Sequence, residues 1–154
     1  MKAKPAKFVL DTQPLHPTFR DPGANEALRE FHRVRAPFEY LSSVVAQELL
    51  AGILRPEGRR TLERHVLGVY ERAGRLITPI ANAWQRSGDV LAAMMREEGL
   101  EIGRVSKSFS NDILLALSCR ESGCVLVSEH HRDFGRIQRH VPFLFVPPWP
   151  CWPA

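Results

Sequence analysis

The sequence predicts a single α/β domain whose mostly parallel central sheet is flanked by helices on both faces. Short apolar runs alternate with longer segments in which apolar residues recur at helical spacing, and this alternation is typical of a covered parallel sheet. The chain has 154 residues, of which 44% are hydrophobic and 25% charged. This size and composition suit one globular domain with its own core. We therefore treat residues 1–154 as one domain that ends in a Pro/Trp-rich tail at 147–154.

Five short apolar runs predict the strands. Each run is bounded by polar residues, proline or glycine, as buried strands are. In chain order the expected strands are residues 7–10, 38–41, 76–78, 124–127 and 141–146. The first run stops at Asp11 and the fourth at Ser128.

The segments between these runs predict helices, because their apolar residues recur three or four positions apart. In chain order the expected helices are residues 24–35, 44–54, 57–75, 79–98 and 108–121, with a short helix or turn at 130–139. Pro37 and Pro56 mark the ends of the first two, and Pro79 is expected to be the first residue of the fourth.

Serine and glycine residues mark the expected helix ends. Ser42 or Ser43 is expected to cap helix 44–54, and Ser108 or Ser110 to cap helix 108–121, because a serine hydroxyl accepts a hydrogen bond from a free helix amide. Gly123 is expected to end the latter helix.

Two further features are expected of helix 79–98. A kink or break is expected at residues 87–88, where serine and glycine are adjacent. We assign Trp84, Met94 and Met95 to the core.

The charge balance and the cysteine count indicate which partner and which cellular compartment to expect. There are 21 Lys+Arg against 17 Asp+Glu, a net charge of +4, and 17 of the 21 cations are Arg. The guanidinium fork suits phosphate oxygens, so this balance favours a polyanionic partner. No segment has the roughly 18 uninterrupted apolar residues of a membrane helix, and we find no secretory signal. With an odd count of 3 cysteines, we expect a soluble, reduced, cytoplasmic protein.

Four carboxylates are expected at the carboxyl edge of the sheet. Asp11 ends the first strand, Asp112 lies in the first turn of helix 108–121, Asp133 follows the fourth strand, and Glu48 lies at the margin of an apolar helix stripe. Taken singly, each could be a turn former, a helix-terminal charge, a cap or a solvated side chain. Gathered in one cleft they would repel one another unless a hard cation compensated. Their joint placement therefore predicts a Mg²⁺ or Mn²⁺ site.

Short motifs surround these acids. They are Phe8-Val9-Leu10-Asp11-Thr12, the stretch 41–49 around Glu48, Ser110-Asn111-Asp112-Ile113-Leu114-Leu115-Ala116, and Val125-Leu126-Val127-Ser128 with Arg132-Asp133-Phe134. In order and approximate spacing they resemble the four acidic motifs of the PIN-domain nucleases. Over residues 7–146 the chain is similar in layout to the VapC-type toxins of toxin-antitoxin pairs.

The resemblance implies a metal-dependent activity. Asp11, Glu48, Asp112 and Asp133 would hold one or two Mg²⁺ or Mn²⁺ ions and activate water for endonucleolytic RNA cleavage. The side chains that would orient these carboxylates are Thr12, Asn111 and Ser128. The implied partners are RNA, a cognate antitoxin and a second copy of this chain.

The fourth motif departs from the family pattern. Many relatives have Thr-x-Asn or Thr-x-Asp after the fourth strand, where this chain has Ser128-Glu129-His130. Ser128 keeps the hydroxyl, but His130 takes the position of the amide or acid. Glu129, His130 and Asp133 are therefore alternatives for completing the site, and we favour Asp133 because Arg-Asp-Phe matches the pattern best.

Two basic clusters accompany the acids. Arg59 and Arg60 belong to an Arg-rich stretch, for which a solvated helix face with i,i+4 ion pairs is the alternative interpretation. His130, Arg132 and Arg136 belong to a second cluster beside the acids. We expect these residues to contact an RNA backbone.

The sequence thus favours a Mg²⁺- or Mn²⁺-dependent endoribonuclease that is the toxin of a pair. The alternatives are a non-catalytic RNA-binding or regulatory module on the same fold, and a housekeeping RNA-processing nuclease without an antitoxin. A metal-dependent phosphatase is disfavoured, because Asp11-Thr12-Gln13 stands where an Asp-x-Asp pair would be needed.

Overall fold

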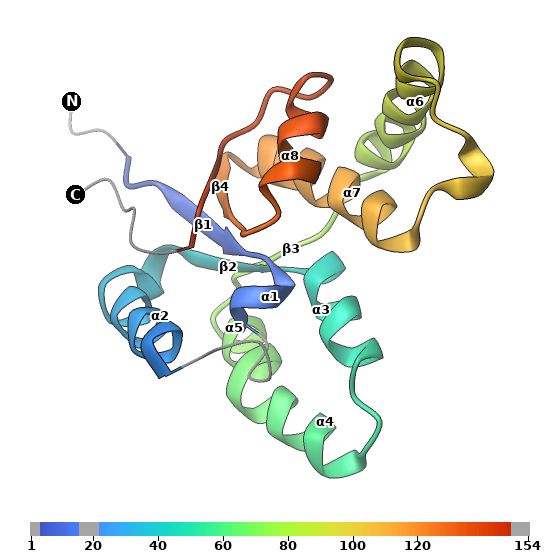
Figure 1. Ribbon diagram of the computed structural model, residues 1–154. Coiled ribbons are helices and arrows are strands. Elements are labelled where there is room, and N and C mark those ends of the chain that lie inside the picture. The colour runs from blue at the N-terminus through green and yellow to red at the C-terminus, as the bar shows by residue number, and fades with distance from the viewer. Residues whose placement is uncertain (1–3, 16–21, 149–154) are drawn as a thin grey trace.

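A five-stranded parallel sheet forms the centre of the computed structural model, which describes residues 4–15 and 22–148 (Figure 1). The strand order is β3-β2-β1-β4-β5 and every neighbouring pair is parallel. The strands are β1 (Lys7–Leu10), β2 (Glu39–Ser42), β3 (Leu76–Ile77), β4 (Cys124–Val127) and β5 (Phe145–Val146). The predicted parallel sheet is confirmed, although its last strand is shorter than predicted.

β1 is the middle strand, and its pairing sets the position of the site. It pairs with β4 from Lys7 opposite Cys124 to Leu10 opposite Val127, and with β2 on its other side. The N–H of Asp11 then donates to the carbonyl of Val127 at 2.9 Å. The residues that follow β1 and β4 therefore leave the sheet side by side at its carboxyl edge.

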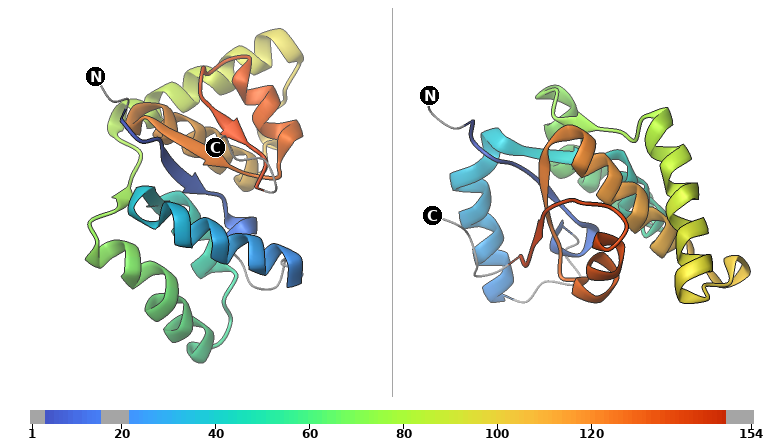
Figure 2. Two further views of the ribbon diagram at one scale, coloured as in Figure 1. Left: turned by 90° about the vertical axis from the view of Figure 1, so that its left-hand side faces the viewer. Right: turned by 90° about the horizontal axis from the view of Figure 1, so that it is seen from above.

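Helices cover both faces of the sheet (Figures 1 and 2). One face carries α2 (Pro22–Arg35), α4 (Pro56–Leu62) and α5 (Gly68–Arg72), and the other carries α6 (Ala81–Glu98), α7 (Lys107–Ser122) and α8 (His131–Gln138). Two short helices, α1 (Thr12–Leu15) and α3 (Ser43–Ala51), follow β1 and β2 directly. Single 3₁₀ turns lie at Ala36–Phe38 and Ile102–Arg104. No helix among residues 4–15 and 22–148 has the length and apolar character needed to cross a bilayer.

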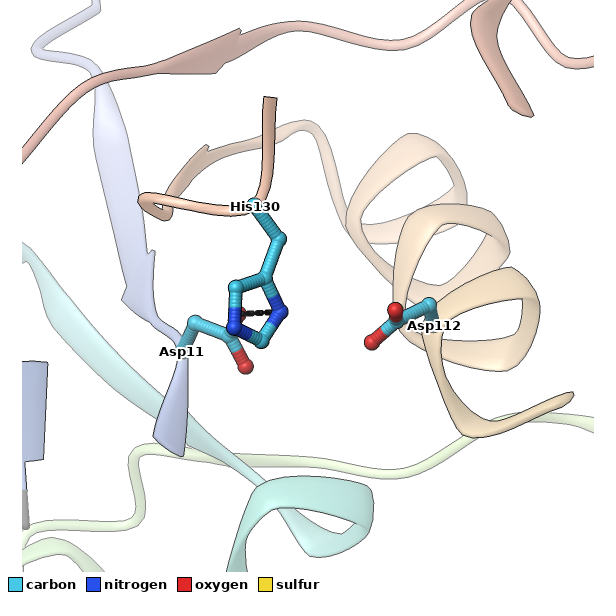
Figure 3. A group of neighbouring side chains, drawn as sticks. All are labelled: Asp11, Asp112 and His130. Atoms are coloured by element: carbon cyan, nitrogen blue, oxygen red, sulfur yellow. Dashed lines mark ion pairs between the residues drawn. The ribbon is translucent and has the colours of Figure 1, made fainter. Parts of the chain in front are cut away.

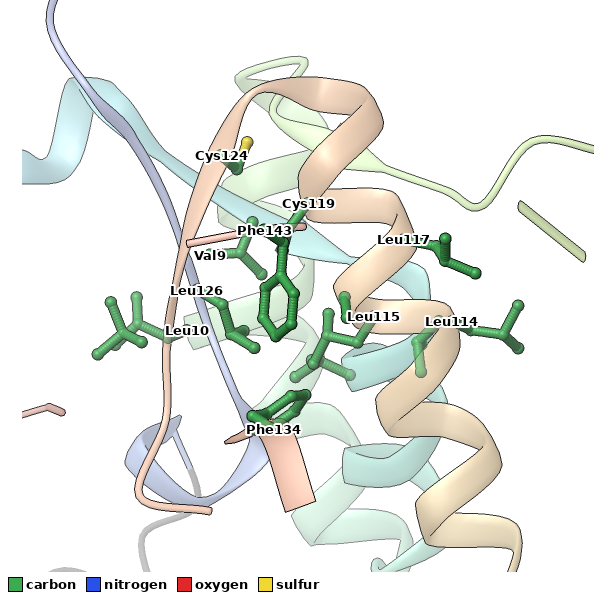
Figure 4. Packing of buried hydrophobic residues seen from close by; sticks show 14 of the residues in the cluster. Val9, Leu10, Leu114, Leu115, Leu117, Cys119, Cys124, Leu126, Phe134 and Phe143 are labelled. Atoms are coloured by element: carbon green, nitrogen blue, oxygen red, sulfur yellow. The ribbon is translucent and has the colours of Figure 1, made fainter. Parts of the chain in front are cut away.

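The buried side chains lie between the sheet and these helices (Figure 4). α7 is the most buried helix, with every residue from Asn111 to Cys119 inside the protein. It packs on Val9 of β1 and Leu126 of β4, and Phe134 of α8 closes the same layer. This packing fixes α7 against the strand ends.

Some predicted helix ends are confirmed and others are wrong. Ser42 caps α3 by accepting from the N–H of Val44 at 3.2 Å, and Gly123 ends α7 with a φ of 66°. The cap of α7, however, is Ser106, which accepts from the N–H of Phe109 at 3.0 Å. The helix therefore starts a residue before Ser108, and Asp112 lies in its second turn rather than its first.

The predicted helix 57–75 is interrupted by a π-helical turn at Glu63–Leu67. The N–H of Gly68 bonds to the carbonyl of Glu63, five residues earlier. A Cβ at position 68 would lie 2.7 Å from that carbonyl oxygen, so this turn requires glycine.

α6 contradicts four of the predictions for helix 79–98. It begins at Ala81 instead of Pro79, and it runs unbroken through residues 87–88, where the Ser87 hydroxyl donates to the Trp84 carbonyl at 2.6 Å. Met94 is buried as predicted, but Trp84 is 59% exposed because it lies on the outer face of the helix. Met95 is also partly exposed.

A buried acid lies at the amino end of β2. Glu39 is 1% exposed, and its carboxylate accepts from the Tyr70 hydroxyl at 2.7 Å. Nδ1 of His32 lies 2.7 and 2.8 Å from its two oxygens, and the Arg75 guanidinium donates to the Glu39 carbonyl at 3.3 Å. Burial and the adjacent carboxylate raise the pKa of Tyr70 far above its usual value. The cluster joins α2, β2 and α5.

Tyr70→Phe should lower the free energy of unfolding by about 1–3 kcal/mol, because it removes one of the two described side-chain partners of a buried carboxylate and leaves only His32. Urea denaturation monitored by circular dichroism would measure the change. Tyr40→Phe is the matched control, since within residues 4–15 and 22–148 the Tyr40 hydroxyl has no hydrogen-bond partner. Equal stabilities of the two variants would contradict the importance of the Glu39 cluster.

Candidate metal centre

Two carboxylates and an imidazole converge at the carboxyl edge of the sheet (Figure 3). Asp11 directly follows β1, Asp112 projects from the second turn of α7, and His130 is the N-cap residue of α8. One oxygen of each aspartate and one ring nitrogen of His130 all lie within 4.8 Å of one another. Three donors this close can share a single cation.

Hydrogen bonds fix the Asp11 carboxylate. Its Oδ1 accepts from the N–H of Thr12 at 2.7 Å, and its Oδ2 accepts from the buried Ser128 hydroxyl at 2.7 Å. Oγ of Ser128 in turn accepts from the N–H of His130 at 3.0 Å. One hydroxyl thus links the end of β1 to the start of α8.

Glu48 of α3 is tied to both aspartates through their neighbours in the chain. Its Oε1 accepts from Nδ2 of Asn111 at 2.9 Å, and its Oε2 accepts from the Thr12 hydroxyl. The half-buried Glu48 carboxylate contributes to the raised pKa values of Asp11 and Asp112.

The three alternatives for completing the site lie in different places. Asp133 is half-buried in the first turn of α8 and raises the pKa of Asp112, but it is outside the group formed by Asp11, Asp112 and His130. Glu129 is exposed. Of the three, only the His130 ring belongs to that group among the described residues.

Burial and like charge set the electrostatics of the centre. Burial, followed by the charges of Asp11, Glu48 and Asp133, raises the pKa of Asp112 to about 8. Burial also raises the pKa of Asp11, against the hydrogen bonds from Ser128 and Thr12 that lower it. The residues therefore fit a hard divalent cation, which would neutralise these carboxylates and take them as oxygen ligands.

A groove of about 680 Å³ runs beside the centre. It is lined by Glu98, Ser108, Glu129, His130, His131, Arg132, Asp133, Arg136 and Arg139. The Arg136 guanidinium bonds to the Glu98 carboxylate and lies 5.2 Å from the centre of the Phe109 ring. Glu98 also contacts Nε2 of His140 at 2.7 Å. This role of Glu98 could not be predicted from the sequence, because the residue lies 38 positions from Arg136.

The other basic residues lie elsewhere. Arg59 and Arg60 are exposed on α4 and pair with Glu63 at 2.9 Å and Glu57 at 3.6 Å. They line a separate depression of about 590 Å³. α4 and α8 lie on opposite sides of the sheet in Figure 1 and in the left view of Figure 2, so the two basic clusters form separate surfaces.

The structure resembles solved structures over nearly its whole length. FitAcB from Neisseria gonorrhoeae is 18% identical with a TM-score of 0.66, and the match covers 94% of this chain and 99% of the other. DNA-bound VapBC from Salmonella typhimurium is 23% identical with a TM-score of 0.66, over 93% and 98%. VapBC2 from Rickettsia felis bound to a promoter DNA fragment is 18% identical with a TM-score of 0.60, over 91% and 97%. The sequence itself matches no protein-family model and no curated protein. The likeness confirms the predicted α/β fold, which this chain shares with these structures.

Asp112→Asn should stabilise the metal-free protein by about 1–3 kcal/mol at pH 7, because burial and three other carboxylates force the folded protein to take up a proton at Asp112, and asparagine needs none. The folded-state pKa of Asp112, about 8, lies above its ordinary value of 3.8. Between pH 3.8 and about 8 the folded protein therefore keeps a proton on Asp112 that the unfolded chain releases. The contribution of Asp112 to stability falls as the pH rises through this range.

Chemical denaturation in EDTA at several pH values between 5 and 8 would measure both effects. The variant should show a smaller loss of stability with rising pH than the unmodified protein. Asp89→Asn on the exposed surface of α6 is the control of equal charge change and should alter neither quantity. A destabilised Asp112→Asn protein with an unchanged pH dependence would contradict the charge-crowding explanation.

Proposed function

We propose that this chain is a Mg²⁺- or Mn²⁺-dependent endoribonuclease and the toxin of a toxin-antitoxin pair. The observation that carries the proposal is the convergence of the buried Asp11 and Asp112 on a PIN-domain fold, with the Asp11 carboxylate held by two hydrogen bonds. Buried acids with raised pKa values in a cleft are typical of functional sites.

The cation would be held by Asp11 and Asp112, with Glu48 and Asp133 as the nearby acids that add negative charge. When bound, a divalent ion lowers the pKa of a water ligand and stabilises charge on phosphate oxygens. The protein supplies the orientation. Ser128, Thr12 and Asn111 hold the Asp11 and Glu48 carboxylates through four hydrogen bonds from their side chains or backbone, so that little reorganisation is needed at the site.

The groove beside the centre suits an RNA backbone. Arg132 and Arg139 are exposed along it, and Arg136 is held in place by Glu98 and Phe109. These arginine side chains, next to the acids, would bind the phosphates on either side of the scissile bond. Arg59 and Arg60 offer a second, more distant surface for the same backbone.

The partner proposal rests on the similar structures. FitAB is described bound to a DNA fragment, and two of the VapBC structures are likewise DNA complexes. We infer that this chain also pairs with a small DNA-binding antitoxin that suppresses its activity, and that it works as a homodimer in the cytoplasm.

The purified chain should cleave single-stranded RNA internally when Mg²⁺ or Mn²⁺ is present, and EDTA should abolish cleavage. Asp11→Asn and Asp112→Asn should each lower the rate at least ~100-fold, because each removes a charged oxygen ligand. Ser128→Ala should cost about 10- to 100-fold, because it frees the Asp11 carboxylate to rotate. Gel analysis of an end-labelled RNA would measure these rates.

Asp89→Asn is the control for the charge change and should cleave at the normal rate. Cleavage in EDTA, or full activity of Asp112→Asn, would contradict the mechanism. RNA binding without any cleavage would instead favour the non-catalytic module.

A short reading frame for a DNA-binding antitoxin should adjoin the gene for this chain. Induced expression of the chain should arrest bacterial growth, and co-expression of the neighbouring protein should restore growth. Asp112→Asn should be harmless at equal expression. An active nuclease with no such neighbour and no effect on growth would favour a housekeeping enzyme.

A further inference from the structure

We propose that His130 donates a ring nitrogen to the bound cation and shifts the preference of the site from Mg²⁺ towards Mn²⁺. This inference rests on the proposed metal-dependent nuclease and concerns the position at which the chain departs from the Thr-x-Asn or Thr-x-Asp pattern. At that position a nitrogen donor stands where an oxygen donor is expected, and this change alters which cation the site prefers.

The placement of the His130 ring supports a ligand role. One of its nitrogens lies within 4.8 Å of both the Asp11 and the Asp112 carboxylate oxygens (Figure 3). Nδ1 is 3.6 Å from Oδ2 of Asp11, which is longer than a hydrogen bond. Two donors that share one small ion at about 2.1 Å lie roughly 3.0–3.5 Å apart, so the observed separation is close to that of two ligands.

The ring is held in this position from two sides. The backbone N–H of His130 donates to Oγ of Ser128, the same hydroxyl that donates to Asp11. The imidazole is stacked on the fully buried Phe134 ring, with a centroid distance of 6.5 Å and an interplanar angle of 15°. The side chain is nevertheless 44% exposed, so an ion and its water ligands can reach it.

Imidazole and carboxylate select cations differently. Mg²⁺ binds almost exclusively oxygen ligands, whereas Mn²⁺, which shares its preference for carboxylates and water, is a transition-metal ion that also accepts an imidazole nitrogen. A neutral imidazole in place of an acid also removes one negative charge from the site, and this weakens the attraction for Mg²⁺ without a compensating bond. Of these two ions, a site with two aspartates and one histidine therefore favours Mn²⁺ over Mg²⁺.

The nitrogen ligand can be observed directly. Mn²⁺ bound to the full chain should show ¹⁴N hyperfine coupling in pulsed electron paramagnetic resonance. The coupling should disappear in His130→Asn and persist in His65→Asn, a control at an exposed histidine of the π-helical turn. Absence of coupling in the unmodified protein, or its persistence in His130→Asn, would overturn the proposal.

Binding of the two metals gives a second readout. By calorimetry, His130→Asn and His130→Asp should each lower the ratio of Mn²⁺ to Mg²⁺ affinity about tenfold, the aspartate by raising Mg²⁺ affinity. An unchanged ratio in both variants would overturn the proposal and leave His130 as a counter-charge for Asp11. Coupling without RNA cleavage would refute the nuclease proposal alone, whereas cleavage without coupling would refute the His130 proposal alone.

Discussion

The crowding of negative charge in a buried space is the constraint on which the rest of the structure depends. Asp11 and Asp112 are almost fully buried, and Glu48 and Asp133 add their fields from the margin. Such an arrangement persists only if the scaffold holds the acids against their repulsion. The scaffold does so because β1 is paired on both sides and α7 is the most buried helix, so neither aspartate can move away without disturbing the core.

The sequence predicted the sheet well because apolar runs bounded by polar residues identify buried strands, and it predicted the acids because they follow those strands. Helix starts were less predictable. Residues 106, 108 and 110 are all serine, and tertiary packing decides which of them caps α7. The contacts of Glu39 and Glu98 were missed because their partners are far away in the chain. An acid inside the apolar run 38–41 was the available signal for the first, since a buried charge requires partners.

His130, which departs from the family pattern, shows what a motif can predict and what it cannot. The motif predicted which loop contributes to the site, and the match at Arg132-Asp133-Phe134 favoured Asp133 within it. The ring of His130 nevertheless lies with Asp11 and Asp112, because the Ser128 hydroxyl and the Phe134 ring fix its backbone and side chain. The turn, the helix cap and the stacked ring that place His130 produce no periodic pattern in the sequence, so they could not be predicted from it.

β2 connects two acidic sites, the Glu39 cluster at its amino end and the metal centre beyond its carboxyl end. It begins at Glu39, whose partners all come from the protein, and it ends at Ser42, which caps the helix that carries Glu48. A four-residue strand spans only about 13 Å, yet in the part of the chain that the structure describes the Glu39 cluster and the metal centre have no side chain in common. Substitutions at the two ends should thus be nearly additive. Metal ligands at one edge can therefore be exchanged while the Glu39 cluster at the other edge preserves the folded state.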